Sequence, residues 1–133
     1  MILEGIVTGL EDDCCYTLFE IAVEGARWRF SAVSPLGDSQ FCVGFESSVN
    51  LKIDSVVTLE CLEPRPDLEA YIVQREGISI EAAGRVFKVV SKDEIEVEIP
   101  EFGGIEVSLE YDSDIQIHQW VRFRGCLCLK QQP

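Results

Sequence analysis

Apolar and polar residues alternate along most of this chain with a period of two, which is typical of β-strands. The clearest runs cover residues 26–30, 51–59, 95–99 and 105–111. Stretches rich in proline, glycine and aspartate separate these runs and predict turns. Several short strands divided by turns favour an all-β sandwich or barrel.

One segment departs from this pattern and predicts a short helix. Residues 66–77 begin with Pro66 and Asp67, which suit a first helical turn, and end with Gly77, which suits a helix stop. The alternation of residues 70–73 fits a strand equally well. We therefore expect at most one short helix in the whole chain.

The second half of the chain repeats features of the first half. Residues 50–62 align with residues 114–127, and a strand containing Gly5 matches one containing Gly84. Each of these strands precedes an acidic turn, and the two prolines at 64 and 66 lie where a linker belongs. We expect two small packed barrels made by duplication, or else one elaborated barrel. The predicted units are 1–64 and 83–133, joined by a connector over 65–82.

The repeated unit consists of a strand with a glycine near its start, an acidic turn, a long hairpin and two closing strands. In the closing strands the apolar residues are spaced as in Leu51, Ile53, Val57 and Leu59. This pattern resembles the OB fold, a small Greek-key β-barrel, over residues 83–129 and also over 3–63. The resemblance implies a binding module, since OB folds bind oligonucleotides, oligosaccharides and proteins.

The charge balance limits the classes of partner. There are 24 acidic residues against 11 basic ones, so the formal net charge is −13. This charge opposes non-specific attraction to nucleic acid and to anionic membranes, and it favours basic partners. No run approaches the roughly 20 apolar residues of a membrane span, and the first residues lack a basic signal-peptide region. We expect a cytoplasmic protein that does not enter a membrane.

Residues 93–114 hold nine carboxylates and neither lysine nor arginine. With Ile95, Val97 and Ile99 pointing inward, the intervening glutamates point outward about 6.7 Å apart. Like charges across a strand pair are destabilising, so this hairpin predicts a docking face for a basic partner. The alternative is a solvated surface that prevents edge-to-edge aggregation. The predicted partner-binding residues are Glu94, Glu96, Glu98, Glu101, Phe102, Glu106, Glu110 and Asp112.

A second candidate face has the opposite charge. If Val121 points inward, then Trp120, Arg122 and Arg124 share the outer face of their strand. An aromatic ring beside two arginines can stack a base or hold a phosphate. The alternative is that these arginines pair with the surrounding carboxylates.

The sequence carries no recognisable catalytic motif. His118 is the single histidine, and the six cysteines form no CxxC pair. A thiolate metal site would require Cys14 and Cys15 to meet Cys126 and Cys128 from the far end of the chain. We predict no catalytic residues, no cofactor and no metal site.

The leading hypothesis is therefore a non-catalytic, acidic protein-binding module. Inhibitors, immunity proteins, nucleic-acid mimics and accessory subunits have this character. The alternative is an OB-type binder of oligonucleotides or oligosaccharides that uses Trp120, Arg122 and Arg124. A third hypothesis is self-association through the apolar residues 41–45 and 70–73.

Overall fold

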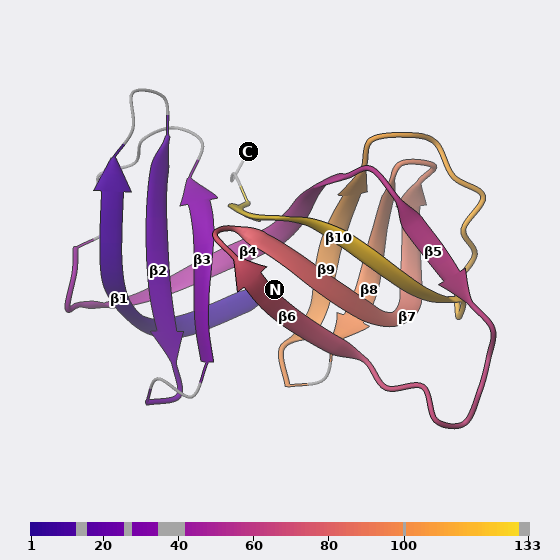
Figure 1. Cartoon of the computed structure of the whole chain (residues 1–133), viewed down its shortest axis with the longest axis horizontal. Helices are drawn as coiled ribbons and strands as arrows, with labels where there is room; N and C mark the ends of the chain where they lie inside the picture. Colours follow the sequence, from indigo (N-terminus) through magenta and orange to yellow (C-terminus); the bar gives the residue numbers. More distant parts are fainter. Residues whose placement is uncertain (13–15, 26–27, 35–41, 100, 131–133) are drawn as a thin grey trace.

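The computed structural model describes residues 1–12, 16–25, 28–34, 42–99 and 101–130 (Figure 1). Within these residues the chain forms ten strands and no helix, so the predicted all-β fold is confirmed. The strands are β1 (Ile2–Asp12), β2 (Thr17–Val23), β3 (Trp28–Ser34), β4 (Glu46–Val56), β5 (Leu59–Leu62), β6 (Tyr71–Glu76), β7 (Ser79–Ser91), β8 (Glu94–Ile99), β9 (Gly103–Leu109) and β10 (Trp120–Leu129).

Each half of the chain builds the same arrangement of four antiparallel strands. β1, β2 and β3 pair in succession, and β4 returns to pair with the other edge of β1. In the same way β7, β8 and β9 pair in succession, and β10 returns to pair with β7. A fourth strand that lies beside the first makes each half a Greek key. Figure 1 shows them as two lobes, with β1–β3 on the left and β7–β9 on the right.

The two Greek keys close on each other through β4 and β10. β10 pairs antiparallel with β4, where Leu127 lies opposite Ile53, and it pairs in parallel with β3 at Val33. β4 also runs parallel to β9 from Ile53 to Val56. The pairings β1-β4-β9-β8-β7-β10-β3-β2-β1 therefore form a closed barrel of eight strands. The β4–β10 pairing crosses this barrel and divides it into ring 1 (β1, β2, β3, β10, β4) and ring 2 (β7, β8, β9, β4, β10).

Two further strands lie outside the closed ring and pair with strands of the barrel. β5 pairs with the first residues of β10, and β6 pairs with the first half of β7. From β6 the Gln74 side chain reaches the open edge of β3. Its Oε1 accepts a hydrogen bond from Ser31 N–H at 2.5 Å, and its Nε2 donates to the Ser31 carbonyl at 2.7 Å. The Gln74 carboxamide thus takes the place of a neighbouring strand at this position.

The helix predicted over residues 66–77 does not form. Tyr71–Glu76 is strand β6, whose pairing with β7 helps to bury Ile72. The chain turns instead before β6, where Leu68 N–H donates to the Arg65 carbonyl at 3.2 Å. Long-range pairing with β7 outweighs a weak local helix preference here. β6 and the first residues of β7 lie within the predicted connector 65–82, and the unit boundaries themselves stay predictions.

Inward-pointing apolar residues from both rings join in one hydrophobic core. β4 and β10 contribute to it along their length because each borders both rings. Their fully or almost fully buried residues are Leu51, Ile53, Val56, Val121, Phe123 and Leu127. The alternation in the sequence predicts this pattern of burial.

Two glycines occupy matching places in the two Greek keys. A Cβ atom on Gly5 of β1 would lie 2.1 Å from the carbonyl oxygen of Ala22 on β2. A Cβ atom on Gly84 of β7 would lie 2.5 Å from the carbonyl oxygen of Glu98 on β8. Neither position has room for a side chain, so both strands depend on glycine to approach their neighbour closely.

Candidate partner-binding surface

The hairpin of β8 and β9 has the predicted alternation of side chains. Its inward apolar residues are buried, and its carboxylates lie on the outer face. Glu96 lies directly opposite Glu106 across the strand pair. Two like charges at this position are unfavourable unless cations lie close to them.

Cations from neighbouring strands compensate the middle of this hairpin. On β7, Lys88 Nζ lies 3.7 Å from Glu96, and Arg85 lies 3.3 Å from Glu98. Each of these pairs is directly cross-strand, because β7 lies beside β8. From the end of β10, Lys130 Nζ donates to Glu106 at 2.5 Å, and this hydrogen bond raises the pKa of Lys130. The hairpin is therefore not a continuous strip of uncompensated charge.

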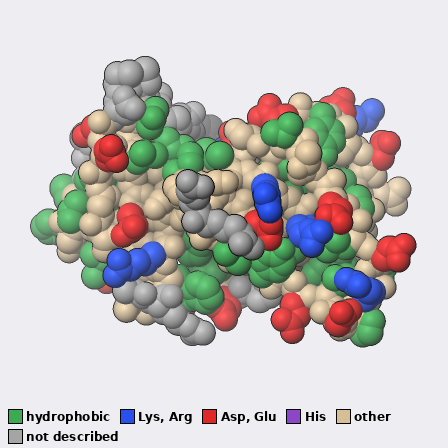
Figure 2. Space-filling model, in the orientation of Figure 1, with side chains coloured by type: hydrophobic (Ala, Val, Ile, Leu, Met, Phe, Trp, Pro, Cys, Tyr) green, Lys and Arg blue, Asp and Glu red, His purple; other side chains and the backbone are tan. Residues whose placement is uncertain are grey.

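The uncompensated carboxylates gather where β7 turns into β8 and where the chain leaves β9. Hydrogen bonds hold these two segments together: Leu109 N–H donates to the Asp93 carbonyl at 2.8 Å, and Ser113 N–H donates to the Lys92 carbonyl at 2.7 Å. Among the described residues no ion pair joins these carboxylates to a lysine or arginine. Lys92 is exposed in the same turn, and Lys130 interacts electrostatically with Glu94 without forming an ion pair with it. Figure 2 shows acidic side chains along this upper right edge, with a basic side chain beside them. We call the group the acidic pole, and its members are Asp93, Glu94, Glu110, Asp112 and Asp114.

The turn between β8 and β9 faces the other lobe. Its Phe102 ring makes edge-to-face contacts with Trp28 and Phe30 of β3, with centroid separations of 5.5 and 5.6 Å. Phe102, which was predicted to bind a partner, is half-buried against the core. Glu101 beside it is exposed. These contacts make Phe102 a packing residue between the lobes.

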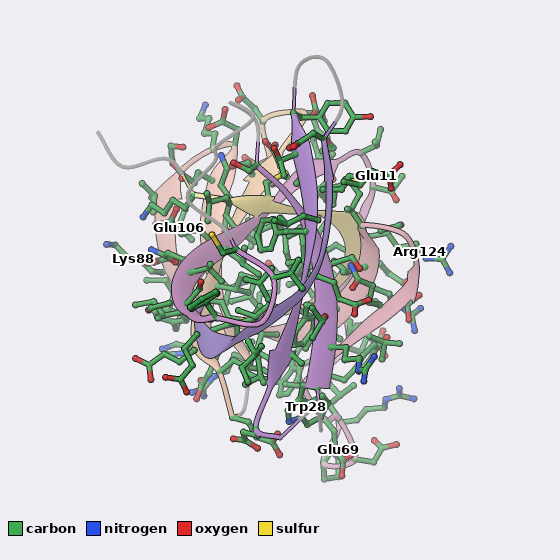
Figure 3. The ribbon with its side chains drawn as sticks, turned by 90° about the vertical axis from the view of Figure 1, so that its left-hand side faces the viewer. Glu11, Trp28, Glu69, Lys88, Glu106 and Arg124 are labelled. Atoms are coloured by element: carbon green, nitrogen blue, oxygen red, sulfur yellow. The ribbon has the colours of Figure 1, made fainter. Side chains whose placement is uncertain are left out.

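The predicted tryptophan–arginine face lies on β10, with Val121 and Phe123 buried beneath it. Arg122 donates two hydrogen bonds to Glu60, at 3.2 and 2.6 Å, and the pKa of Arg122 is raised mainly for this reason. Arg124 donates to Glu81 at 3.1 Å. Figure 3 shows Arg124 on the opposite side of the molecule from Lys88 and Glu106.

Both arginines line a polar groove of about 570 Å³ with those carboxylates. Tyr71 also donates to Glu81 at 2.9 Å. Trp120 is half-buried on the same strand. The two arginine charges are therefore already engaged by carboxylates of this chain.

The thiols differ in exposure. Cys42 and Cys61 are exposed, and Cys126 and Cys128 are half-buried. Burial first, and then the nearby Asp54, raise the pKa of Cys128 to about 11, which makes it a poor nucleophile at neutral pH. Cys14 and Cys15 lie outside the described residues.

No group of three or more histidine, cysteine, aspartate or glutamate side chains in the described part of the chain is placed to hold a metal ion. His118 lies in the turn before β10 with a φ of 74°. It borders a shallow hollow with Asp114 and Gln119.

The structure also adds detail to the segments considered for self-association. Val43 and Phe45 are exposed beside β1, where Gly44 N–H donates to the Val7 carbonyl at 2.8 Å. Phe41 lies outside the described residues. In the second segment Ile72 is buried, so that segment offers a smaller apolar surface than its sequence suggests.

Sequence reasoning missed a groove of about 680 Å³ on the first lobe. It extends over β1, β2 and β3 and reaches the turn between β6 and β7. The sequence indicates this groove only weakly, through apolar residues at outward positions where the alternation predicts polar ones. Examples are Leu18 on β2 and Val33 on β3, which are half-buried between inward-pointing neighbours.

No known protein family matches this chain, and it matches neither a curated protein nor a solved structure. Among the described residues there is no helix of the length and apolar character needed to cross a membrane.

Proposed function

We propose that this protein is a non-catalytic, acidic binding module that docks a basic protein partner, with the acidic pole at the centre of the docking surface. The observation that carries this proposal is the contrast between two groups of carboxylates. Glu96, Glu98 and Glu106 are compensated by cations of the chain itself. No carboxylate of the acidic pole forms an ion pair with a lysine or arginine of the described residues. Lys92 of the same turn is not paired with them, and Lys130 acts on Glu94 only at longer range, so most of the negative charge of the pole is available to a partner.

Three residues of the predicted docking set belong to this pole, namely Glu94, Glu110 and Asp112. Glu110 and Asp112 are exposed and Glu94 is half-buried. Exposed charges of this kind raise the rate of association and select the partner more than they raise affinity. Inhibitors, immunity proteins, nucleic-acid mimics and accessory subunits all use such a surface, and a basic partner is common to these roles.

We also infer that the two halves are OB-type barrels that arose by duplication and that share their last strands, β4 and β10. In support, β4-β1-β2-β3 and β10-β7-β8-β9 have the same pairing order. Each set closes into a five-stranded ring with the last strand of the other set, and five strands is the number in an OB fold. Gly5 and Gly84 make the same close approach in the two sets. This inference supports a binding role without selecting the ligand.

The oligonucleotide-binding alternative has less support. Arg122 and Arg124 would have to give up Glu60 and Glu81 before they could contact a phosphate. A nucleic-acid strand that approaches this face is also repelled by the net charge of −13 on the protein.

The first experiment is a pull-down from host lysate at low and at moderate salt, with and without nuclease. We expect a basic protein that is retained after nuclease treatment and released by salt. Its association rate should fall for the double variant Glu110→Lys and Asp112→Lys. The control is Glu4→Lys with Glu63→Lys, two exposed carboxylates outside the acidic pole. Each double variant changes the net charge from −13 by four units to −9.

The control separates a specific surface from overall charge. An equal loss of association in both double variants would show that net charge alone drives binding. Retention of nucleic acid and no protein would instead favour the tryptophan–arginine face. Either result contradicts docking through the acidic pole.

A further inference from the structure

The first lobe carries an apolar groove on the surface of β1, β2 and β3. Its apolar lining comes from β1, β2, β3 and the turn between β6 and β7, with Leu10, Tyr16, Leu18, Val33 and Ile78 among the residues. Leu10 is 38% exposed although it is a large apolar side chain. A volume of about 680 Å³ falls in the range of preformed binding sites in proteins. Figure 2 shows hydrophobic side chains on the upper part of this lobe.

The polar residues of the groove are mainly acidic or neutral. Glu11 and Glu20 lie on its walls, together with Ser31, and none of the described residues that line it is a lysine or arginine. Figure 3 shows Glu11 projecting from the lobe. Glu20 accepts a hydrogen bond from Thr8 Oγ1 at 2.7 Å, and Arg29 lies 3.9 Å from it at the limit of an ion pair. An occupant with positive charge beside apolar groups would therefore complement both parts of the lining.

The shape of the groove favours an extended chain. It extends over three adjacent strands, on which Leu18 lies opposite Val33 and Glu20 lies opposite Ser31. An occupant that runs along the strands therefore passes an apolar row and then a polar row. The outward positions Leu18 and Glu20 on β2, and Ser31 and Val33 on β3, alternate an apolar with a polar side chain. An extended peptide presents its own side chains with a matching period of two.

We propose that this groove binds an extended segment of a partner protein in which apolar residues alternate with lysine or arginine. The site is separate from the acidic pole, because it lies on the first lobe and the pole lies on the second. It gives the module a second, sequence-selective contact. The proposal does not depend on docking at the pole.

The test measures fluorescence anisotropy of labelled short peptides mixed with the intact protein. A peptide of alternating leucine and lysine is compared with leucine–glutamate and serine–lysine peptides. We expect the leucine–lysine peptide to bind at least about ten-fold more tightly than either of the others. Equal binding of serine–lysine would show attraction by charge alone, and equal binding of leucine–glutamate would show an unselective apolar hollow. Both results overturn the proposal.

Gly9 provides a way to fill the groove without disturbing the strand. A Cβ atom at Gly9 has only the Glu20 Cβ atom nearby, at 3.7 Å. Gly9→Leu should weaken binding of the leucine–lysine peptide by about ten-fold or more. Ser48→Leu adds the same side chain at an exposed position of β4 outside the groove and serves as the control.

Thermal unfolding confirms that each variant is folded, and Leu18→Lys provides a second test by repelling the peptide within the groove. Unchanged peptide binding in a folded Gly9→Leu or Leu18→Lys protein overturns the proposal. Loss of binding in the Glu110→Lys and Asp112→Lys variant but not in the groove variants overturns it too, and leaves docking at the acidic pole standing. Loss in the groove variants alone supports the groove, even if no basic protein is retained in the pull-down.

Discussion

Gln74 joins β6 to the open edge of β3, and its removal gives a direct test of how the two lobes are held together. Its side chain makes hydrogen bonds of 2.5 and 2.7 Å with both backbone groups of Ser31 in a half-buried position. A hydrogen bond of this type contributes about 0.5–1.5 kcal/mol to stability. Gln74→Leu keeps a side chain of similar size and removes both bonds. The free energy of unfolding should therefore fall by about 1–3 kcal/mol.

Urea unfolding followed by tryptophan fluorescence measures this change, since Trp28 lies on the same strand as Ser31. With a slope of about 1–3 kcal/mol per molar urea, the midpoint should fall by roughly 1 M. Gln116→Leu is the matched control, because Gln116 is exposed in the loop before β10. If Gln74→Leu stays within about 0.5 kcal/mol of the parent protein, as a neutral surface substitution does, the edge of β3 does not depend on Gln74.

Four further predictions concern the glycines, the reactivity and titration of one thiol, and the overall charge. Gly84→Ala places a methyl group 2.5 Å from the Glu98 carbonyl oxygen and should lower the free energy of unfolding by about 1–3 kcal/mol. Gly9→Ala, which has more room, should change the free energy of unfolding by less than about 0.5 kcal/mol. Equal effects of the two variants in urea unfolding would contradict this prediction. Cys128, whose pKa is raised from 9.0 to about 11, should react with a disulfide reagent at pH 8 about a hundred-fold more slowly than exposed Cys61, and comparable rates would refute the burial argument. Because the pKa of Cys128 is raised on folding, the stabilisation by its neutral thiol is complete below about pH 9 and is lost as the pH rises through about 11. Denaturant titrations across this pH range should show the loss in the parent protein and not in the Cys128→Ser variant. Sodium chloride at pH 7 should raise the melting temperature, because it screens self-repulsion at a net charge of −13, and a fall would show that ion pairs dominate.

Features with a period of two could be predicted from the sequence. In β8, β9 and the first half of β10 the sequence alone predicts which side chains are buried, because the pleat of a strand sends neighbours to opposite faces whatever the strand pairs with. Gly5 and Gly84 could be matched from the sequence as equivalent positions of a repeat, but Gly84 lies in the middle of β7, and the close approach that both glycines allow is visible only in the structure. The all-β class follows from these local patterns.

The aligned repeat does not predict the burial of every matched residue. The alignment of residues 50–62 with 114–127 matches Val57 with Val121. Val57 is 68% exposed beyond the end of β4, and Val121 is fully buried in β10. Similar residues in similar order therefore occupy different environments, because β4 and β10 pair with different neighbours along their length.

The distribution of charge on the acidic hairpin depended on the tertiary structure. Arg85 and Lys88 precede the hairpin in sequence and Lys130 follows it, and only strand pairing brings them to its carboxylates. The contact of Phe102 with Trp28 and the formation of β6 in place of a helix arise in the same way. The sequence by itself determined the inward and outward sides of the regularly alternating strands, such as β8 and β9, since these sides are set by the local backbone. The tertiary structure decided which charges stay uncompensated and where an apolar groove opens, since both depend on residues that are distant along the chain.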